Sequence, residues 1–314
     1  RLISEHMRTI ALLACALLGT LCLVQLPAKT IRMPIDDVRA GMRGIGITVF
    51  DGSRREEFDV NVLGVLKNVM GPQRNIVIAR LSGGPLAITG VIQGMSGSPV
   101  YIGGQLIGAV SYALGSFTTE AIAGITPIEE MIDAVEFPAR RPPMQPVALH
   151  FPMSSDQLIK ILRGPLHRIS TFALQPSDVV VTEDSVSSVQ HVGTMLRPIG
   201  TPLSISGFDT HVTELLGSAL HGTGMTPQLG GAQEVNISVS STPLQPGDAI
   251  SVTLIDGDLS LAGIGTVTMV EEDRVYAFGH QFQNLGPIQF LMNRAHVHAL
   301  LPSLLSSSKI ATVG

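Results

Sequence analysis

The amino-acid sequence predicts a mainly β fold with some helices, on three observations. The chain of 314 residues contains 33 glycines and 20 prolines, which supply the many tight turns that a β-rich fold requires. Short runs of β-branched and other apolar residues, separated by glycine, recur along the chain after residue 30. Hydrophobic residues account for 45% of the sequence and charged residues for 14%, so there is ample apolar surface to build a core, which excludes intrinsic disorder.

A nucleic-acid partner is not expected. The 20 Lys and Arg residues are outnumbered by 25 Asp and Glu residues, which gives a net charge of -5. A surface that tracks phosphates normally carries a basic excess. Trp is absent and Tyr occurs three times, which is too few for a platform on which bases stack.

The first 28 residues are predicted to form a signal peptide, with residues 1–6 upstream of the start at Met7. An apolar run at 10–26 follows Met7, and Ala28 is a small residue suited to cleavage. The alternative is an uncleaved membrane anchor, since roughly 17 apolar residues reach the lower limit for crossing a bilayer. Membrane contact is expected only through this segment. We therefore expect an exported protein, placed in the periplasm or cell envelope or secreted.

Both cysteines, Cys15 and Cys22, lie inside this segment. The mature chain therefore has no thiol, which excludes a cysteine nucleophile and a thiolate metal site. An exported protein without disulfides depends on its apolar core for stability.

Residues 30–137 are predicted to form a serine-motif β domain. Alternating or continuous apolar runs predict strands at 46–50, 58–63 and 75–80. Residues 99–102 and 105–111 read as a hairpin, because the intervening Gly103-Gly104 supplies the positive φ angles of a tight turn. Thr126 and Pro127 predict the start of a helix, as its N-cap and its first residue.

The remaining chain divides into three predicted parts. A Pro-rich linker occupies 138–146, a mixed α/β region with a helix at 209–221 follows at 147–235, and a histidine-motif β region covers 236–314. In the last region we expect strands at 250–254 and 263–268. Gly263–Met269 echoes Gly44–Phe50, a Gly-Ile-Gly followed by alternating β-branched residues, which indicates two similar barrel openings.

The hexapeptide Gly94-Met95-Ser96-Gly97-Ser98-Pro99 carries the candidate nucleophile. Acyl transfer needs a hydroxyl on a tight turn with small neighbours, and backbone N–H groups directed at the developing oxyanion. We expect Ser96 to be the nucleophile and the N–H groups of Gly94 and Ser96 to form the oxyanion hole. Ser98 is a competing nucleophile at a position that usually holds a small filler. A Gly- and Ser-rich loop without chemistry is the other reading.

A serine nucleophile needs a proton acceptor, which is most often a histidine. No histidine lies between residues 7 and 149, so an imidazole partner must come from beyond the proline-rich segment. His280 is the candidate general base, because a strand-like run ending in Gly279 places it beside a tight turn. The alternative is a buried structural histidine. The nine histidines are His6, His150, His167, His191, His211, His221, His280, His296 and His298.

A metal site is not expected. His296 and His298 would share one face of a strand, as metal ligands sometimes do, but no third ligand with suitable spacing accompanies them. No organic cofactor is expected either.

Two blocks resemble the SpoIVB peptidase family, serine peptidases of the chymotrypsin-like clan. The first runs from Thr48-Val49-Phe50-Asp51 through Gly94-Met95-Ser96-Gly97-Ser98-Pro99 to Ile107-Gly108-Ala109-Val110-Ser111, and the second from Gly263-Ile264-Gly265-Thr266-Val267-Thr268 to Gly279-His280. The resemblance implies chymotrypsin-like β-barrel elements, a protein or peptide substrate, Ser96 as nucleophile and His280 as general base.

The chain departs from that family in two respects. The histidine block follows the serine block here, whereas it precedes it in the sporulation protease that names the family. The fold is therefore expected to be either permuted within one barrel or split between two units, the second continuing past Gly314. The family's acidic residue has no counterpart near Leu81. Two functions follow: an exported serine endopeptidase, or a catalytically inactive protease-like binding or scaffold protein of the cell envelope.

Overall fold

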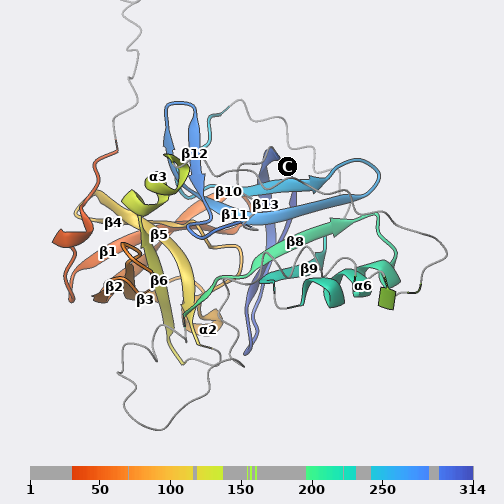
Figure 1. Ribbon diagram of the computed structural model, residues 1–314, viewed down its shortest axis with the longest axis horizontal. Helices are drawn as coiled ribbons and strands as arrows, with labels where there is room; N and C mark the ends of the chain where they lie inside the picture. The colour runs from red at the N-terminus through yellow and green to blue at the C-terminus, as the bar shows by residue number, and fades with distance from the viewer. Residues whose placement is uncertain are drawn as a thin grey trace, which may run out of the picture. The chain divides into compact units, whose positions relative to one another are not determined.

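The computed structural model describes residues 30–69, 71–115, 119–136, 196–221, 223–230, 242–282 and 290–313, together with Ser154, Asp156, Gln157 and Lys160. From Ile31 onward, the residues that it describes belong to one compact unit (Figure 1). The predicted signal peptide and the Pro-rich linker lie outside the described residues. Within the described ranges, no helix is both long enough and apolar enough to cross a bilayer.

The first half of the described chain builds a closed antiparallel barrel. Its six strands are β1 (Arg43–Asp51), β2 (Arg54–Leu66), β3 (Ile76–Ser82), β4 (Pro99–Ile102), β5 (Gln105–Leu114) and β6 (Ala121–Pro127). They follow the order β4-β1-β2-β3-β6-β5, and β5 pairs back to β4 to close the barrel. Strand β7 (Leu196–Pro198) adds to the outer edge of β5. The closed six-stranded barrel confirms the prediction of a mainly β, chymotrypsin-like fold.

Alternating side chains explain why these strands close around a core. Phe58, Val60 and Val62 of β2 are buried, while Glu57 and Asp59 beside them are exposed. The tight turn predicted between β4 and β5 is confirmed, since Gly103 and Gly104 have φ angles of 56° and 79°. The buried side chains of the barrel include Phe50, Phe58, Val60, Val62, Val77, Leu81, Leu86, Ile92, Met95, Val100, Ile107, Val110 and Ile125.

The second half forms an open sheet in the order β14-β13-β10-β11-β8-β9, with β12 paired to β11. Strands β8 and β9 run parallel, and the other pairs are antiparallel. A side-chain hydrogen bond from Gln228 to Ser308 links the two outer strands, β9 and β14. The strands are β8 (Thr201–Ser206), β9 (Met225–Leu229), β10 (Ala249–Ile255), β11 (Ser260–Glu271), β12 (Arg274–Ala277), β13 (Leu291–Leu301) and β14 (Ser308–Val313).

The helices are short: the 3-10 helix η1 (Ile35–Asp37), α2 (Leu86–Thr89), α3 (Ile128–Glu136) and α6 (Thr210–Leu220). Helix α6 confirms the helix predicted after Asp209, whose carboxylate accepts the N–H of His211 at 2.8 Å as the N-cap. Helix α3 begins at Ile128, later than predicted. Thr126 instead stays in β6, where its hydroxyl lies 2.6 Å from that of Ser111.

The two Gly-Ile-Gly segments use their second glycine in the same way. A Cβ on Gly46 of β1 would lie 2.1 Å from the ring of Phe58, and one on Gly265 of β11 would lie 2.3 Å from the ring of Phe278. In each strand the missing side chain leaves room for an aromatic ring. The sequence echo therefore corresponds to a repeated packing device, one copy in each sheet.

Backbone and ionic contacts join the barrel to the second sheet. Gly52, which follows β1, exchanges two hydrogen bonds with Val297 of β13, at 2.7 and 2.9 Å. Asp248 accepts from Arg294 at 2.6 Å and lies 3.6 Å from Arg55 of β2. The predicted division at 137, 146 and 235 stays a prediction: β7 joins the barrel, whereas β8, α6 and β9 belong with the second sheet.

Candidate active site

The predicted nucleophile turn lies between helix α2 and strand β4. Gly94 and Gly97 have φ angles of 89° and 95°, a region that favours glycine. Gly97 is also confined by its surroundings, since a Cβ there would lie 2.0 Å from the carbonyl oxygen of Thr266. Its N–H donates to the carbonyl of Val110 in β5 at 2.8 Å. The two glycines are thus required both by the turn and by the strands packed against it.

Strand β11 of the second sheet holds the carbonyl groups of this turn. The hydroxyl of Thr266 donates to the carbonyl of Gly94 at 3.0 Å, and its N–H donates to that of Ser96 at 2.9 Å. The hydroxyl of Thr268 donates to the carbonyl of Gly97 at 2.7 Å. Strand β11, which contains the start of the second block of the family resemblance, therefore holds the nucleophile turn of the first block in place through hydrogen bonds.

The N–H groups of the turn are used differently from its carbonyls. Across the described ranges, no hydrogen bond engages the N–H of Gly94 or that of Ser96. These are the two donors that the sequence predicted for an oxyanion hole. With the neighbouring carbonyls held by β11, both donors remain available to an anionic oxygen.

The two serines of the turn differ in how their hydroxyls are used. Ser98 donates to the carbonyl of Met95 at 2.5 Å, so its hydroxyl is committed to the turn itself. Ser96 is 0% exposed, and its Oγ is buried without a hydrogen-bond partner. A buried polar atom without a partner is costly and therefore calls for an explanation. The contrast favours Ser96 over Ser98 as the nucleophile.

His280 follows strand β12 through a tight bend. Phe278 and Gly279 both have positive φ, at 65° and 69°, which is uncommon for a phenylalanine and costs free energy on the order of 1–2 kcal/mol. Gly279 lies against β5: its Cβ position is 3.0 Å from the Cβ atoms of Ala109 and Ser111. The prediction that His280 stands at a strand end beside a turn is confirmed by this geometry.

The same hydrogen-bonded chain connects His280 to Ser96. The N–H of Phe278 donates to the carbonyl of Thr266 at 3.3 Å, and the N–H of Thr266 donates to the carbonyl of Ser96. The structure thus brings the nucleophile turn and the His280 bend to one region between β5 and β11. No hydrogen bond joins the two side chains, and their pairing stays a prediction.

The imidazole of His280 is held by backbone carbonyls. Its Nδ1 lies 3.0 Å from the carbonyl oxygen of Gln281, an acceptor that places the ring proton on Nδ1. Nε2 is then the unprotonated nitrogen, and it is buried without a partner although the residue as a whole is half-buried. Burial lowers the pKa of His280, and the carbonyls of Gln281 and Ile199 oppose this effect. Burial therefore favours the neutral form of the ring.

An orienting carboxylate was not expected from the sequence, and among the described residues none hydrogen-bonds to His280. The carbonyl of Gln281 occupies the position at Nδ1 that a carboxylate holds in a catalytic triad. A neutral carbonyl stabilises an imidazolium less than a carboxylate does.

The other described histidines lie elsewhere. His211 and His221 are exposed, on α6 and at its end. On β13 the rings of His296 and His298 are 4.9 Å apart, and His298 lies 2.8 Å from the hydroxyl of Thr312. Within the described ranges, no group of three metal-ligating side chains occurs. His6, His150, His167 and His191 lie outside the described residues.

Sequence reasoning missed three residues that contact the turn: Thr266, Thr268 and Lys309. The two threonines carried a signal, because they stand two apart in an otherwise apolar strand and so face the same side of it. Lys309 donates its backbone N–H to the carbonyl of Gln93 at 3.1 Å, next to the turn. Nothing in its sequence neighbourhood distinguishes it from an exposed lysine.

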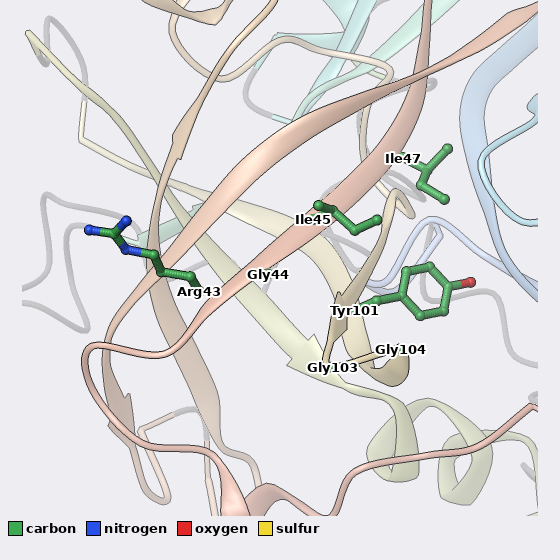
Figure 2. Close-up of a pocket in the computed structure, with 7 residues that line it drawn as sticks. All are labelled: Arg43, Gly44, Ile45, Ile47, Tyr101, Gly103 and Gly104. Atoms are coloured by element: carbon green, nitrogen blue, oxygen red, sulfur yellow. The ribbon is translucent and has the colours of Figure 1, made fainter.

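A separate hollow lies on the barrel, between β1 and the β4–β5 turn (Figure 2). It is open, mainly apolar and about 630 Å³ in volume. Ile45, Ile47 and Tyr101 gather at one end of it, and Arg43 lies at the other. Neither Ser96 nor His280 lines it, so it is distinct from the nucleophile turn.

Comparison with known proteins gives one match. Residues 25–132 match the family model of the SpoIVB peptidase S55, a segment that contains the whole barrel and the nucleophile turn. Neither a curated protein nor a solved structure matches the chain. The barrel and the turn lie within the matched segment: over residues 25–132 the chain is similar to the SpoIVB peptidase S55 family.

Proposed function

We propose that this protein is an exported serine endopeptidase of the SpoIVB type, with Ser96 as nucleophile and His280 as general base. One observation carries the proposal. Ser96 Oγ and His280 Nε2 are both buried polar atoms without hydrogen-bond partners, on segments that are joined through Thr266. Pairing the hydroxyl with the imidazole would satisfy both atoms at once.

The proposed reaction uses groups of the chain at each step. Nε2 of His280 takes the proton of Ser96 as Oγ attacks the carbonyl carbon of the scissile peptide. The N–H groups of Gly94 and Ser96 hydrogen-bond to the resulting oxyanion. His280, now protonated and supported by the Gln281 carbonyl, donates its proton to the leaving amine. A water molecule, activated by the same imidazole, then hydrolyses the acyl-enzyme.

The family implies a protein substrate. The proposal of export is supported by the apolar run at 10–26, a pattern that is typical of a signal peptide. We infer a location in the periplasm or cell envelope, or secretion from the cell.

One observation favours the second candidate function, a catalytically inactive scaffold. Ser96 is fully covered, so a peptide reaches it only after the segments above it move. In a scaffold the covered turn would be a permanent part of the core. In a peptidase it would be the closed form of a site that opens to substrate.

Labelling separates the two functions. The full chain is incubated with a fluorophosphonate probe and with an unfolded protein substrate, alongside the variants Ser96→Ala and Ser98→Ala. If the protein is a peptidase, the wild-type chain and Ser98→Ala react with the probe and cleave the substrate. Ser96→Ala does neither. A folded wild-type chain that neither labels nor cleaves contradicts the proposal and supports the scaffold.

A further inference from the structure

Lys309, the second residue of β14, is an unusual residue for a protein core. Its side chain is 0% exposed, and its Nζ donates to the hydroxyl of Thr48 in β1 at 2.9 Å. No carboxylate of the described residues forms an ion pair with it. Lysine is almost never fully buried without such a partner. Burial alone lowers the pKa of Lys309 to about 7.

The position of Lys309 connects it to the nucleophile turn. The backbone of Gln93 is hydrogen-bonded to the start of β14. Its N–H donates to the carbonyl of Ser307 at 2.8 Å, and its carbonyl accepts the N–H of Lys309 at 3.1 Å. The side-chain carbons of Lys309 lie 3.3 and 3.4 Å from the point that a Cβ on Gly94 would occupy. The lysine stem therefore covers Gly94, whose N–H is one of the two proposed oxyanion donors.

Filling space does not explain a lysine here. A methionine or leucine would cover Gly94 equally well without removing an amine from water. The amine instead spans from the turn to the barrel wall at Thr48. Costly buried ionisable groups gather at functional sites more often than elsewhere.

We propose that Lys309 is a positioning residue of the nucleophile turn, which acts through Gly94 by anchoring the turn to Thr48 of the barrel. The proposal rests on the proposed function, since it assigns Gly94 to the oxyanion hole. Lys309 ties three parts of the molecule together: strand β1, the turn and strand β14.

The charge of Lys309 should affect this anchor. The groups against it from β1, the turn and β13 are Thr48, Gly94 and Leu300, none of which titrates. The nearby His298 of β13 is engaged with Thr312 instead. Protonation would therefore place an ammonium without a counter-charge at this buried position, and we expect the turn to shift as the pH falls through about 7.

The test uses Lys309→Met, with Ile310→Val as a control on the same strand, and two measurements between pH 5.5 and 9. Nuclear magnetic resonance follows the amide signal of Gly94, and fluorophosphonate labelling follows the reactivity of Ser96. In wild type and Ile310→Val, the Gly94 signal should shift with a midpoint near pH 7. In Lys309→Met that step should vanish, and labelling at pH 8 should slow about tenfold while the melting temperature rises.

Thr48→Val provides a second variant that keeps the lysine but removes its anchor, and it should slow labelling in the same direction. A Gly94 signal that titrates identically in wild type and Lys309→Met overturns the proposal, as does an unchanged labelling rate in Lys309→Met. A wild-type chain that does not label, while its Gly94 signal keeps the lysine-dependent step, contradicts the peptidase function and leaves the anchor supported.

Discussion

Thr266 is bonded to Ser96 through the backbone: its N–H donates to the serine carbonyl at 2.9 Å. The carbonyl of Thr266 accepts the N–H of Phe278, two residues before His280. A single residue of β11 therefore lies between the proposed nucleophile and the proposed base. Two backbone hydrogen bonds therefore link the serine block to the histidine block, although the two blocks are far apart in the sequence.

Replacing Thr266 by valine should weaken both the fold and the site. The substitution keeps the shape of the side chain but removes the hydroxyl that donates to the buried Gly94 carbonyl. The loss should lower the free energy of unfolding by about 1–3 kcal/mol. Urea denaturation measures this change, and phosphonate labelling should slow in parallel. Thr266→Ser keeps the hydroxyl and should stay close to wild type; equal losses in both variants would show that the methyl group, not the hydrogen bond, matters.

The paired glycines Gly46 and Gly265 should respond differently to alanine. Both substitutions force a Cβ into an aromatic ring, at 2.1 Å from Phe58 and 2.3 Å from Phe278, and should cost at least about 1–3 kcal/mol. Gly265→Ala should additionally reduce labelling of Ser96, because the displaced Phe278 leads directly to His280.

The control for this pair is Gly64→Ala in β2, where a Cβ would meet nothing within 4 Å. Its melting temperature should stay near that of wild type. The account fails if Gly46→Ala and Gly265→Ala slow labelling equally once the samples are matched for folded fraction.

Peptidase activity should persist to a lower pH than an ordinary histidine would allow. Burial lowers the pKa of His280 below 6.5, and the base works only when neutral, so the activity should fall only as the pH drops below that lowered value. At pH values between the lowered pKa of folded His280 and 6.5, this histidine is protonated more fully in the unfolded chain than in the folded chain. Stability should therefore decrease as the pH falls through that window.

The measurement is a proton-carbon resonance titration of His280 together with the pH dependence of thermal unfolding. The fall in stability attributed to His280 should be absent in His280→Gln. A titration midpoint of His280 at or above pH 6.5 would contradict the lowering of its pKa by burial.

Asp248 should stabilise the second sheet through Arg294 more strongly than it stabilises the contact with the barrel through Arg55. Its carboxylate is 10% exposed and contacts Arg294 at 2.6 Å and Arg55 at 3.6 Å. Asp248→Asn would leave the partly buried Arg294 without its counter-charge and should cost about 3 kcal/mol in the free energy of unfolding. Arg55→Ala, which removes the longer and more exposed contact, should cost less than about 1 kcal/mol. A reversed order of these two losses in urea denaturation would contradict the assignment.

Much of the fold could be predicted because its signals are local. Alternation predicted β2, β-type runs bounded by turn residues predicted β1 and β10, Gly103-Gly104 predicted the β4–β5 hairpin, and Asp209 predicted the start of α6. Each of these depends on residues that are neighbours in the sequence. The start of α3 was placed too early, because Thr126 belongs to β6. Its hydroxyl is hydrogen-bonded to that of Ser111, which is not its neighbour in the sequence.

The site was predictable only in its chemistry. The small residues around Ser96 indicated a nucleophile turn. Because no histidine lies between residues 7 and 149, the proton acceptor was expected from a later histidine such as His280. Which strand holds the turn depends on pairings between distant segments, which no local pattern encodes. Lys309 could not be found at all, since a lysine is expected on the surface. Nor could the complete burial of Ser96 be read from the turn sequence.

The most direct test of the account is a crystal structure of the full chain after reaction with a phosphonate inhibitor. The account predicts a covalent bond from the phosphorus to Oγ of Ser96. It also predicts Nε2 of His280 within about 3.2 Å of an adduct oxygen, and another phosphonate oxygen facing the N–H groups of Gly94 and Ser96. A different imidazole at the adduct, or a phosphonate bonded to Ser98 instead of Ser96, would contradict it.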